Sequence, residues 1–286
     1  MLDRRAFLTG ALSVLATPVA DAQQAGRVYH IGAILQGGPY YAAVDGLRAG
    51  LKEFGLDERK QYVLDVHDTK GDLKAVEALA TRLEEQKVDL IYTVGTSVSL
   101  AAKRATKSTP IVFYAGTDPV ALGLVRSFRE PGGRLTGIHG QFTDLTGKRL
   151  ELLREMIPTL QRVVTFYNPD NPVARRSLTI ARDAARQLKV ELRERPVFSV
   201  EELRTGRRAL QPGEADAFFF VSDGMVISHE EVVLNTAKAK RLPVMLSSEG
   251  NVANGPWQAM ARVTTHSADC RPSPSSVFCL VSHGSS

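Results

Sequence analysis

The chain has 286 residues, of which 43% are hydrophobic, 23% charged and 7% aromatic. This balance is typical of one large domain or of two lobes of roughly 110–150 residues, and it excludes disorder, collagen and coiled coil as descriptions of the whole chain. Lys and Arg number 36 against 31 Asp and Glu, so the net charge of +5 is mild and we expect no nucleic-acid partner.

The first 22 residues are predicted to be an export signal. Arg4 and Arg5 precede an apolar run over residues 6–16, and residues 20–22 (Ala-Asp-Ala) form a small-x-small cleavage pattern. The run is shorter than the roughly 20 residues of a membrane span, and the paired arginines resemble a twin-arginine signal. An ordinary secretion signal is the alternative. Either signal leads out of the cytoplasm, and we expect the mature protein in the periplasm of a bacterium.

Short apolar runs then alternate with amphipathic stretches. The run VYHIGAIL at residues 28–35 is typical of a buried strand, and residues 40–54 repeat apolar side chains at helical spacing. This regular alternation predicts right-handed βαβ units and a parallel sheet in a first lobe over residues 27–141. Its predicted strands are 28–35, 62–68, 88–95, 110–116 and 135–140, and its predicted helices are 40–54, 73–86, 97–105 and 119–128.

The alternation starts again after a crossing point predicted near residues 140–146. Two consecutive α/β sets without a Pro/Gly/Ser-rich linker predict an α/β protein of two Rossmann-like lobes joined by a tight hinge, the second over residues 142–255. Ligands of open α/β sheets bind beyond the carboxyl ends of the strands, so the residues after each apolar run are site candidates. The predicted strands here are 162–168, 190–197, 215–222 and 243–248, and the predicted helices are 144–156, 173–188, 200–210 and 228–241.

The common catalytic and metal-binding spacings are absent from the sequence. The segment GTSVS at residues 95–99 approaches a nucleophile elbow but ends in Ser where Gly is needed. The six histidines never recur at three- or four-residue spacing, and Cys270 and Cys279 are too few for a four-thiolate site. We therefore expect no metal, no cofactor and no enzymatic activity. The alternatives are an exported α/β enzyme and a ligand sensor that docks on a membrane receptor.

The strongest site candidates follow the strand that ends at residue 95. Gly95, Thr96 and Ser97 open a predicted helix, and the free N–H groups at a helix start favour a carboxylate or another anion. Thr96 or Ser97 is also the expected N-cap of that helix, a role that needs no ligand.

Other strand ends carry further candidates. Asp118 either accepts a hydrogen bond from a ligand ammonium or caps the predicted helix that follows it. Tyr40, expected to be the more exposed of the Tyr40-Tyr41 pair, is a candidate for stacking on a ligand. Each such residue alone is typical of a turn, but two facing sets predict a clamshell that closes on a small ligand. The second lobe contributes Asn168, Ser222, Asp223 and Glu249.

Three motifs resemble one family of transport proteins. GTDPVALGLV (116–125), EPGGRLTG (130–137) and GKRLELL (147–153) resemble those of the ABC-transporter substrate-binding proteins of the tryptophan/tyrosine-type family, and the resemblance covers residues 28–255. It implies a type I periplasmic-binding fold, no catalysis, and delivery of a small solute, such as an amino acid, to an ABC permease in the inner membrane. By matching strand ends, it implies ligand contacts at Gly95, Thr96, Ser97, Asp118, Asn168, Ser222, Asp223 and Glu249.

The sequence departs from that family after Gly255. Members continue with ALASYG and with helices that complete the fold and return to the first lobe, whereas this chain reads PWQAMA over residues 256–261. Back-translation with the frame displaced by one nucleotide permits L-A-S-Y-G-A, so we hypothesise a frameshift near Gly255. The tail over residues 256–286 is then expected to be disordered, and the fold incomplete at this end with apolar faces uncovered.

Overall fold

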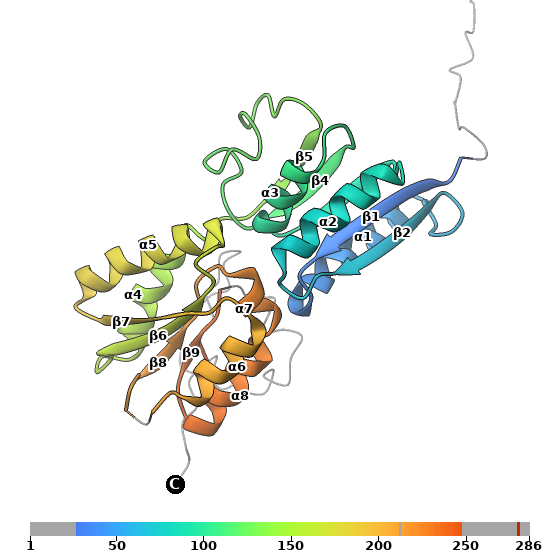
Figure 1. Ribbon diagram of the computed structural model, residues 1–286. Helices are drawn as coiled ribbons and strands as arrows, with labels where there is room; N and C mark the ends of the chain where they lie inside the picture. The colour runs from blue at the N-terminus through green and yellow to red at the C-terminus, as the bar shows by residue number, and fades with distance from the viewer. Residues whose placement is uncertain (1–26, 212, 248–278, 281–286) are drawn as a thin grey trace, which may run out of the picture.

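The computed structural model describes residues 27–211, residues 213–247 and the pair Cys279–Leu280. The predicted export signal, the site candidate Glu249 and all of the tail over residues 256–286 except that pair lie outside the described residues. The described chain forms two α/β lobes, each built on its own sheet (Figure 1). Among the described residues, no helix combines the length and the apolar character that crossing a membrane requires.

The first lobe contains a parallel sheet in the order β2-β1-β3-β4-β5. Helices α2 and α3 cover one face of this sheet and α1 lies on the other (Figure 1). The strands are β1 (Tyr29–Leu35), β2 (Tyr62–Asp68), β3 (Leu90–Val94), β4 (Ile111–Ala115) and β5 (Leu135–His139), and the helices are η1 (Gly38–Tyr40), α1 (Tyr41–Glu53), α2 (Leu73–Glu85) and α3 (Thr96–Ala105).

The second lobe has the sheet order β10-β9-β8-β6-β7, in which only the β10–β9 pair is antiparallel. Helices α4 and α5 pack on one face and α6, α7 and α8 on the other. The strands are β6 (Arg162–Tyr167), β7 (Glu191–Pro196), β8 (Ala217–Phe219), β9 (Val244–Met245) and β10 (Cys279–Leu280), and the helices are α4 (Thr146–Met156), α5 (Pro172–Leu188), α6 (Val200–Arg208), α7 (Gly224–Ser228) and α8 (Glu230–Lys240).

Alternation along the strands divides the first lobe's core between the two sheet faces. Ala33 and Leu35 pack toward α1, whereas Ile34 packs toward α2 and α3. The α1 side is less complete over the last two strands, where Tyr114 is half-buried and Ile138 is 67% exposed. Parallel sheets normally have both faces covered. No helix of the described residues covers this part of the sheet.

Two predicted helices differ in the structure. Residues 119–128 form turns instead of a helix, because Gly123 adopts a left-handed φ of +67° and the Leu124 and Val125 N–H groups both bond back to the Pro119 carbonyl. The helix predicted over residues 228–241 begins later, as α8, because His229 (φ −119°, ψ 31°) is not helical and separates α8 from the short α7, which the sequence interpretation did not predict.

We predict that Gly137→Ala lowers the free energy of unfolding, and that Gly50→Ala does not. A Cβ at Gly137 would lie 2.0 Å from the Phe113 carbonyl oxygen on the paired strand, so β4 and β5 would have to separate. A Cβ at Gly50 meets nothing within 4 Å, and alanine favours a helix interior by about 0.5–1 kcal/mol. Urea denaturation measures both variants. Equal stabilities would contradict the predicted close approach of the two strands.

Glu84 gives this lobe a pH-dependent contact. Its carboxylate accepts the backbone N–H groups of Lys107, Ser108 and Thr109, and these bonds lower its pKa to about 2 from an ordinary 4.5. The unfolded chain therefore binds a proton at higher pH than the folded chain does, and this stabilisation is lost as the pH falls from about 4.5 to about 2.

We predict that Glu84→Gln is less stable than the wild type at pH 7 and that the difference shrinks below about pH 4.5. Thermal unfolding between pH 2.5 and pH 7 measures it. A difference independent of pH would show that the Glu84 charge does not stabilise the loop.

Candidate functional site

A cavity of about 810 Å³ lies where the carboxyl ends of the strands of the two lobes face each other. The first lobe contributes the ends of β1, β3 and β4, and the second contributes the ends of β8 and β9. The clamshell predicted from paired strand ends therefore corresponds to a real cavity. Its polar lining residues are Gln36, Thr96, Ser97, Thr117, Thr143, Ser222 and Ser247, together with the hydroxyl-bearing rings of Tyr40, Tyr92 and Tyr114.

The start of α3 forms one wall of the cavity. The N-cap is Gly95, with a φ of +106° that favours glycine, and no side chain caps the helix. The expectation that Thr96 or Ser97 is the N-cap is therefore wrong, because they are the first and second residues of the helix itself. The freed Thr96 hydroxyl accepts the Gly116 N–H (3.0 Å), and the Ser97 hydroxyl donates to Asn171 Oδ1 across the lobes (2.7 Å).

Gln36 lies between the two lobes. Its side-chain amide packs closely against Gly224 in the second lobe. A Cβ added to Gly224 would lie 1.7 Å from Gln36 Oε1. Gln36 is 2% exposed, and its Nε2 has no hydrogen-bond partner among the described residues. The hydroxyl of Ser222 is also buried without a partner there. Buried polar groups without a partner cost free energy, so these two groups favour a polar ligand that forms the missing hydrogen bonds.

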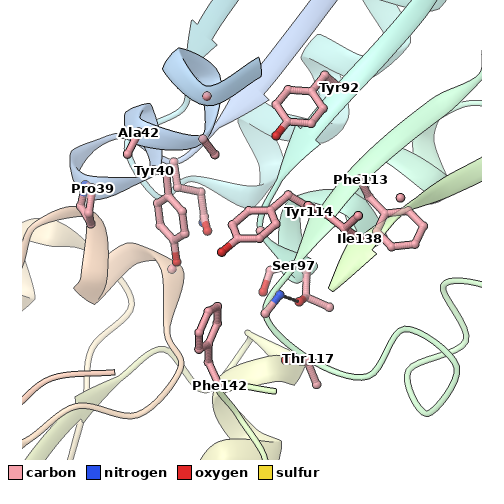
Figure 2. Close-up of a pocket in the computed structure, with 18 of the residues that line it drawn as sticks. Pro39, Tyr40, Ala42, Tyr92, Ser97, Phe113, Tyr114, Thr117, Ile138 and Phe142 are labelled. Carbon is pink, nitrogen blue, oxygen red and sulfur yellow. Dashed lines mark hydrogen bonds between the residues drawn. The ribbon is translucent and has the colours of Figure 1, made fainter. Parts of the chain in front are cut away.

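Aromatic side chains form another part of the lining. Figure 2 shows the rings of Tyr40, Tyr114 and Phe142 turned toward a common space. Tyr40 is half-buried and packs against the cores of both lobes, whereas Tyr41 is 41% exposed. The expectation that Tyr40 is the more exposed of the pair is therefore wrong. Burial, and then the charge of Asp223, raise the pKa of Tyr40, so its hydroxyl stays protonated.

Asn171 and Asp223 connect the second lobe to the first. The Asn171 side chain caps α5, accepts from Ser97 and donates to Asp223 Oδ2 (3.3 Å). Asp223 is fully buried and also accepts the N–H groups of Asn168 (2.9 Å) and Val226 (3.0 Å). Burial raises the pKa of Asp223, while these N–H donors act in the opposite direction.

Several predicted contacts do not line the cavity. Asp118 accepts the N–H groups of Val120 and Ala121, the hydrogen bonds of a capping residue, although turns and not the predicted helix follow it. Asn168 contributes its backbone N–H to Asp223, and Asp223 itself is saturated by donors within the second lobe. The structure thus brings Tyr40, Gly95, Thr96, Ser97 and Ser222 together on the cavity and places Asp118, Asn168 and Asp223 behind its walls.

Backbone contacts bring the lobes together near the cavity. A Cβ added to Gly38 would lie 2.6 Å from the Ser228 carbonyl oxygen, and one added to Gly71 would lie 2.7 Å from the Cα of Met225. Both glycines have positive φ. Only glycine can occupy these positions without pushing α7 away from the first lobe.

Away from the lobe interface the cavity opens into an apolar groove between α1 and the uncovered part of the first sheet. Leu47, Leu51 and Phe54 line the α1 side, and Val112 and Ile138 line the sheet side. Phe54 is 86% exposed. No described helix covers this apolar groove of the first lobe.

The sequence interpretation missed nine polar or aromatic lining residues. Gln36 is the residue directly after the first predicted strand, so inspecting every strand end would have found it. Phe142 and Thr143 lie in the crossing segment, which carries no strand signal. The other six are Phe54, Tyr92, Phe113, Tyr114, Thr117 and Ser247.

The chemistry of the described lining is that of neutral recognition. It contains no Asp, Glu, Lys, Arg or His, and the described residues hold no cluster of three His, Cys, Asp or Glu that could bind a metal ion. The lining therefore offers N–H and O–H donors, carbonyl acceptors and ring faces to a ligand, while a charged ligand group would be stabilised by oriented backbone dipoles.

Comparisons with known proteins agree on one family. The sequence profile described as "ABC transporter substrate binding protein" matches residues 30–267, a span that runs past Gly255. A curated relative from Clostridioides difficile, named "Tyrosine-binding protein", is 27% identical over 213 residues, which are 74% of this chain and 61% of the relative. An uncharacterised Rickettsia prowazekii protein is 20% identical over 75% of this chain and 63% of its own length. The matched region thus spans about three fifths of either relative.

Solved structures confirm the predicted fold. A conserved domain protein from Vibrio cholerae superposes with a TM-score of 0.70 at 24% identity, covering 80% of this chain and 76% of that one. An ABC domain from Streptococcus pneumoniae, in complex with L-Trp, superposes with a TM-score of 0.68 at 21% identity, covering 79% and 76%. The expected type I periplasmic-binding fold is therefore confirmed.

We predict that Asn171→Ala lowers the free energy of unfolding by about 2–3 kcal/mol, because it removes the cap of α5 and leaves Ser97 and Asp223 each short of a partner. Asn168→Ala is the matched control. Its side chain accepts the Asp170 N–H at an exposed turn, so a loss below about 1 kcal/mol is expected. Urea denaturation measures both, and equal losses would contradict a special role for Asn171.

Proposed function

Because the chain belongs to the ABC transporter substrate-binding protein family, we propose that it binds an aromatic amino acid between its lobes and delivers it to an ABC permease in the inner membrane. The observation that carries the proposal is the mixed lining of the cavity, which combines unpaired polar donors with aromatic rings. The relative named as a tyrosine-binding protein supports this class of solute.

The polar part of the lining, formed by the start of α3, Gln36 and Ser222, suits a carboxylate. The first N–H groups of a helix have no partner within the helix, and at α3 no side chain replaces one. Gln36 Nε2 and the Ser222 hydroxyl are further buried donors on the same cavity. A carboxylate here would be stabilised by several hydrogen bonds and by the positive end of the α3 dipole.

The aromatic part of the lining suits the ring of a ligand. Tyr40 and Phe142 approach the central space from different parts of the chain, and Tyr114 extends from β4 between them and the first sheet (Figure 2). Offset or edge-to-face contacts between aromatic rings contribute about 0.5–1.5 kcal/mol beyond the burial of their area. A short aliphatic amino acid would leave these contacts unmade.

We assign no reaction to this cavity. The family binds solutes, and the described lining residues carry no general acid or base with a suitable ordinary pKa. Export by the predicted twin-arginine signal would place the cavity in the periplasm, where a permease of the inner membrane is accessible. Release to that permease would require the lobe contacts at Ser97 and at α7 to open.

Thermal unfolding of the purified chain with added solutes tests the proposal. A ligand that binds only the folded state stabilises it by about 2.7 kcal/mol at 100 times its Kd, or about 5–10 °C for a protein of this size. We expect L-tyrosine or L-tryptophan to give this shift, and tyramine and tryptamine, which lack the carboxylate, to give none. No saturable shift with any aromatic amino acid would overturn the proposal.

Two variants locate the carboxylate. Gln36→Met keeps the side-chain volume but removes the amide, so we expect at least tenfold weaker binding in titration calorimetry. Asp118→Ala removes turn hydrogen bonds of a residue that does not line the cavity, so we expect unchanged affinity. Wild-type affinity in Gln36→Met would show that the carboxylate binds in another part of the cavity. Weaker binding in Asp118→Ala would show that Asp118 contacts the ligand.

A further inference from the structure

A connected chain of buried hydrogen bonds runs from the first lobe to the second through the segment that joins them. The hydroxyls of Thr117 and Thr143 lie 2.6 Å apart, and the Thr143 carbonyl accepts the Thr146 hydroxyl at 2.6 Å. Thr146 Oγ1 lies 2.9 Å from Ser177 Oγ, which accepts the Ser222 N–H at 3.0 Å. The four hydroxyl-bearing residues before Ser222 are 0% exposed.

The direction of most of this chain follows from counting protons. Each hydroxyl has one proton, and the Thr146 proton is directed to the Thr143 carbonyl, which can only accept. Ser177 must therefore donate to Thr146, since its own oxygen accepts the Ser222 N–H. The order is Ser222 N–H to Ser177, Ser177 to Thr146, and Thr146 to Thr143. Hydrogen bonds aligned in this way polarise and strengthen one another.

Arg149 joins the same chain from the side. It is 2% exposed, and its guanidinium donates to Thr146 Oγ1 (3.2 Å) and to the carbonyls of Phe220 (2.7 Å) and Leu246 (3.0 Å). The described partners of this cation are all neutral, and burial lowers its pKa to about 9. Arg149 Nε is buried without a partner among the described residues, so the hydrogen bonds of its two terminal nitrogens must offset the cost of burying the cation. The positions of the two accepting carbonyls are therefore strongly constrained.

The chain ends on the walls of the cavity. Thr117 and Thr143 at one end of the hydrogen-bond chain line the cavity, and so do Ser222 at its other end and Ser247. Arg149 holds the carbonyl of Leu246, the residue directly before Ser247. The intervening residues Thr146, Ser177 and Arg149 do not line the cavity.

We propose that Thr146, Ser177 and Arg149 are positioning residues for solute binding, which fix the second-lobe wall at Ser222 and Ser247 relative to the crossing segment and the first lobe. This inference rests on the proposed function for its ligand. Positional errors of about 1 Å in a binding site are costly, so loss of a hydroxyl that touches no ligand should still weaken binding.

Matched substitutions of Thr146 test the proposal with L-tyrosine and L-tryptophan as probes. Thr146→Val keeps the shape and removes the hydroxyl, and Thr146→Ser keeps the hydroxyl. We expect at least tenfold weaker binding in Thr146→Val and less than threefold in Thr146→Ser. Thr106→Val is the control, because Thr106 is also buried and its hydroxyl donates to a backbone carbonyl at 2.7 Å, away from the cavity. Equal affinities in the Val variants at positions 146 and 106 would overturn the proposal.

Hydrogen exchange of the Ser222 amide in the ligand-free chain gives a second measurement. That N–H donates to Ser177, so Thr146→Val should increase its exchange at least tenfold, and Thr106→Val should leave it unchanged. Unchanged exchange in Thr146→Val would overturn the proposal even if the wild type binds neither probe. A wild type that binds neither probe, with faster Ser222 exchange in Thr146→Val, would instead overturn the proposed solute and retain the positioning of the wall.

Discussion

The arrangement of the lobes depends on one buried carboxylate. Asp223 is fully buried, and the hydrogen bonds that hold it come from neutral N–H groups in the loop between β6 and α5 and at the start of α7. A charge in that position is tolerated only where the surrounding donors converge on it. The same donor set includes Asn171, whose amide oxygen accepts the Ser97 hydroxyl of the first lobe. Satisfying Asp223 therefore places the second-lobe loops and one of the contacts between the lobes.

The cavity combines a polar lining at the lobe interface with an apolar groove because the first sheet is incompletely covered. At the lobe interface, polar strand ends meet and leave donors such as Gln36 Nε2 unpaired. On the α1 side of β4 and β5, apolar side chains such as Ile138 remain exposed. A parallel sheet loses stability when one face stays in contact with water, since burying apolar area contributes about 25 cal/mol per Å². A segment that covered this face would narrow the groove but would not alter the polar lining at the lobe interface.

The sequence predicted much of the candidate site because helix and strand periodicity identifies strand ends. Ser97 and Ser222 were found in this way, and both line the cavity. Asp118 was not separable from a capping residue, since the same carboxylate chemistry serves a ligand and a turn. Phe142 lies in the crossing segment, where no periodicity marks a buried side chain, and its ring is brought into the cavity by the fold alone.

The sequence by itself determined the two α/β lobes, because local periodicity and regular alternation of short apolar runs specify strands, helices and parallel pairing. It also determined the family, because three motifs occur in the same order. Only the tertiary structure decided that Tyr40 is packed between the lobes, that Arg149 is buried among carbonyls, and that the region after Asp118 forms turns. Each of these depends on contacts between residues far apart in the chain, which local patterns do not encode.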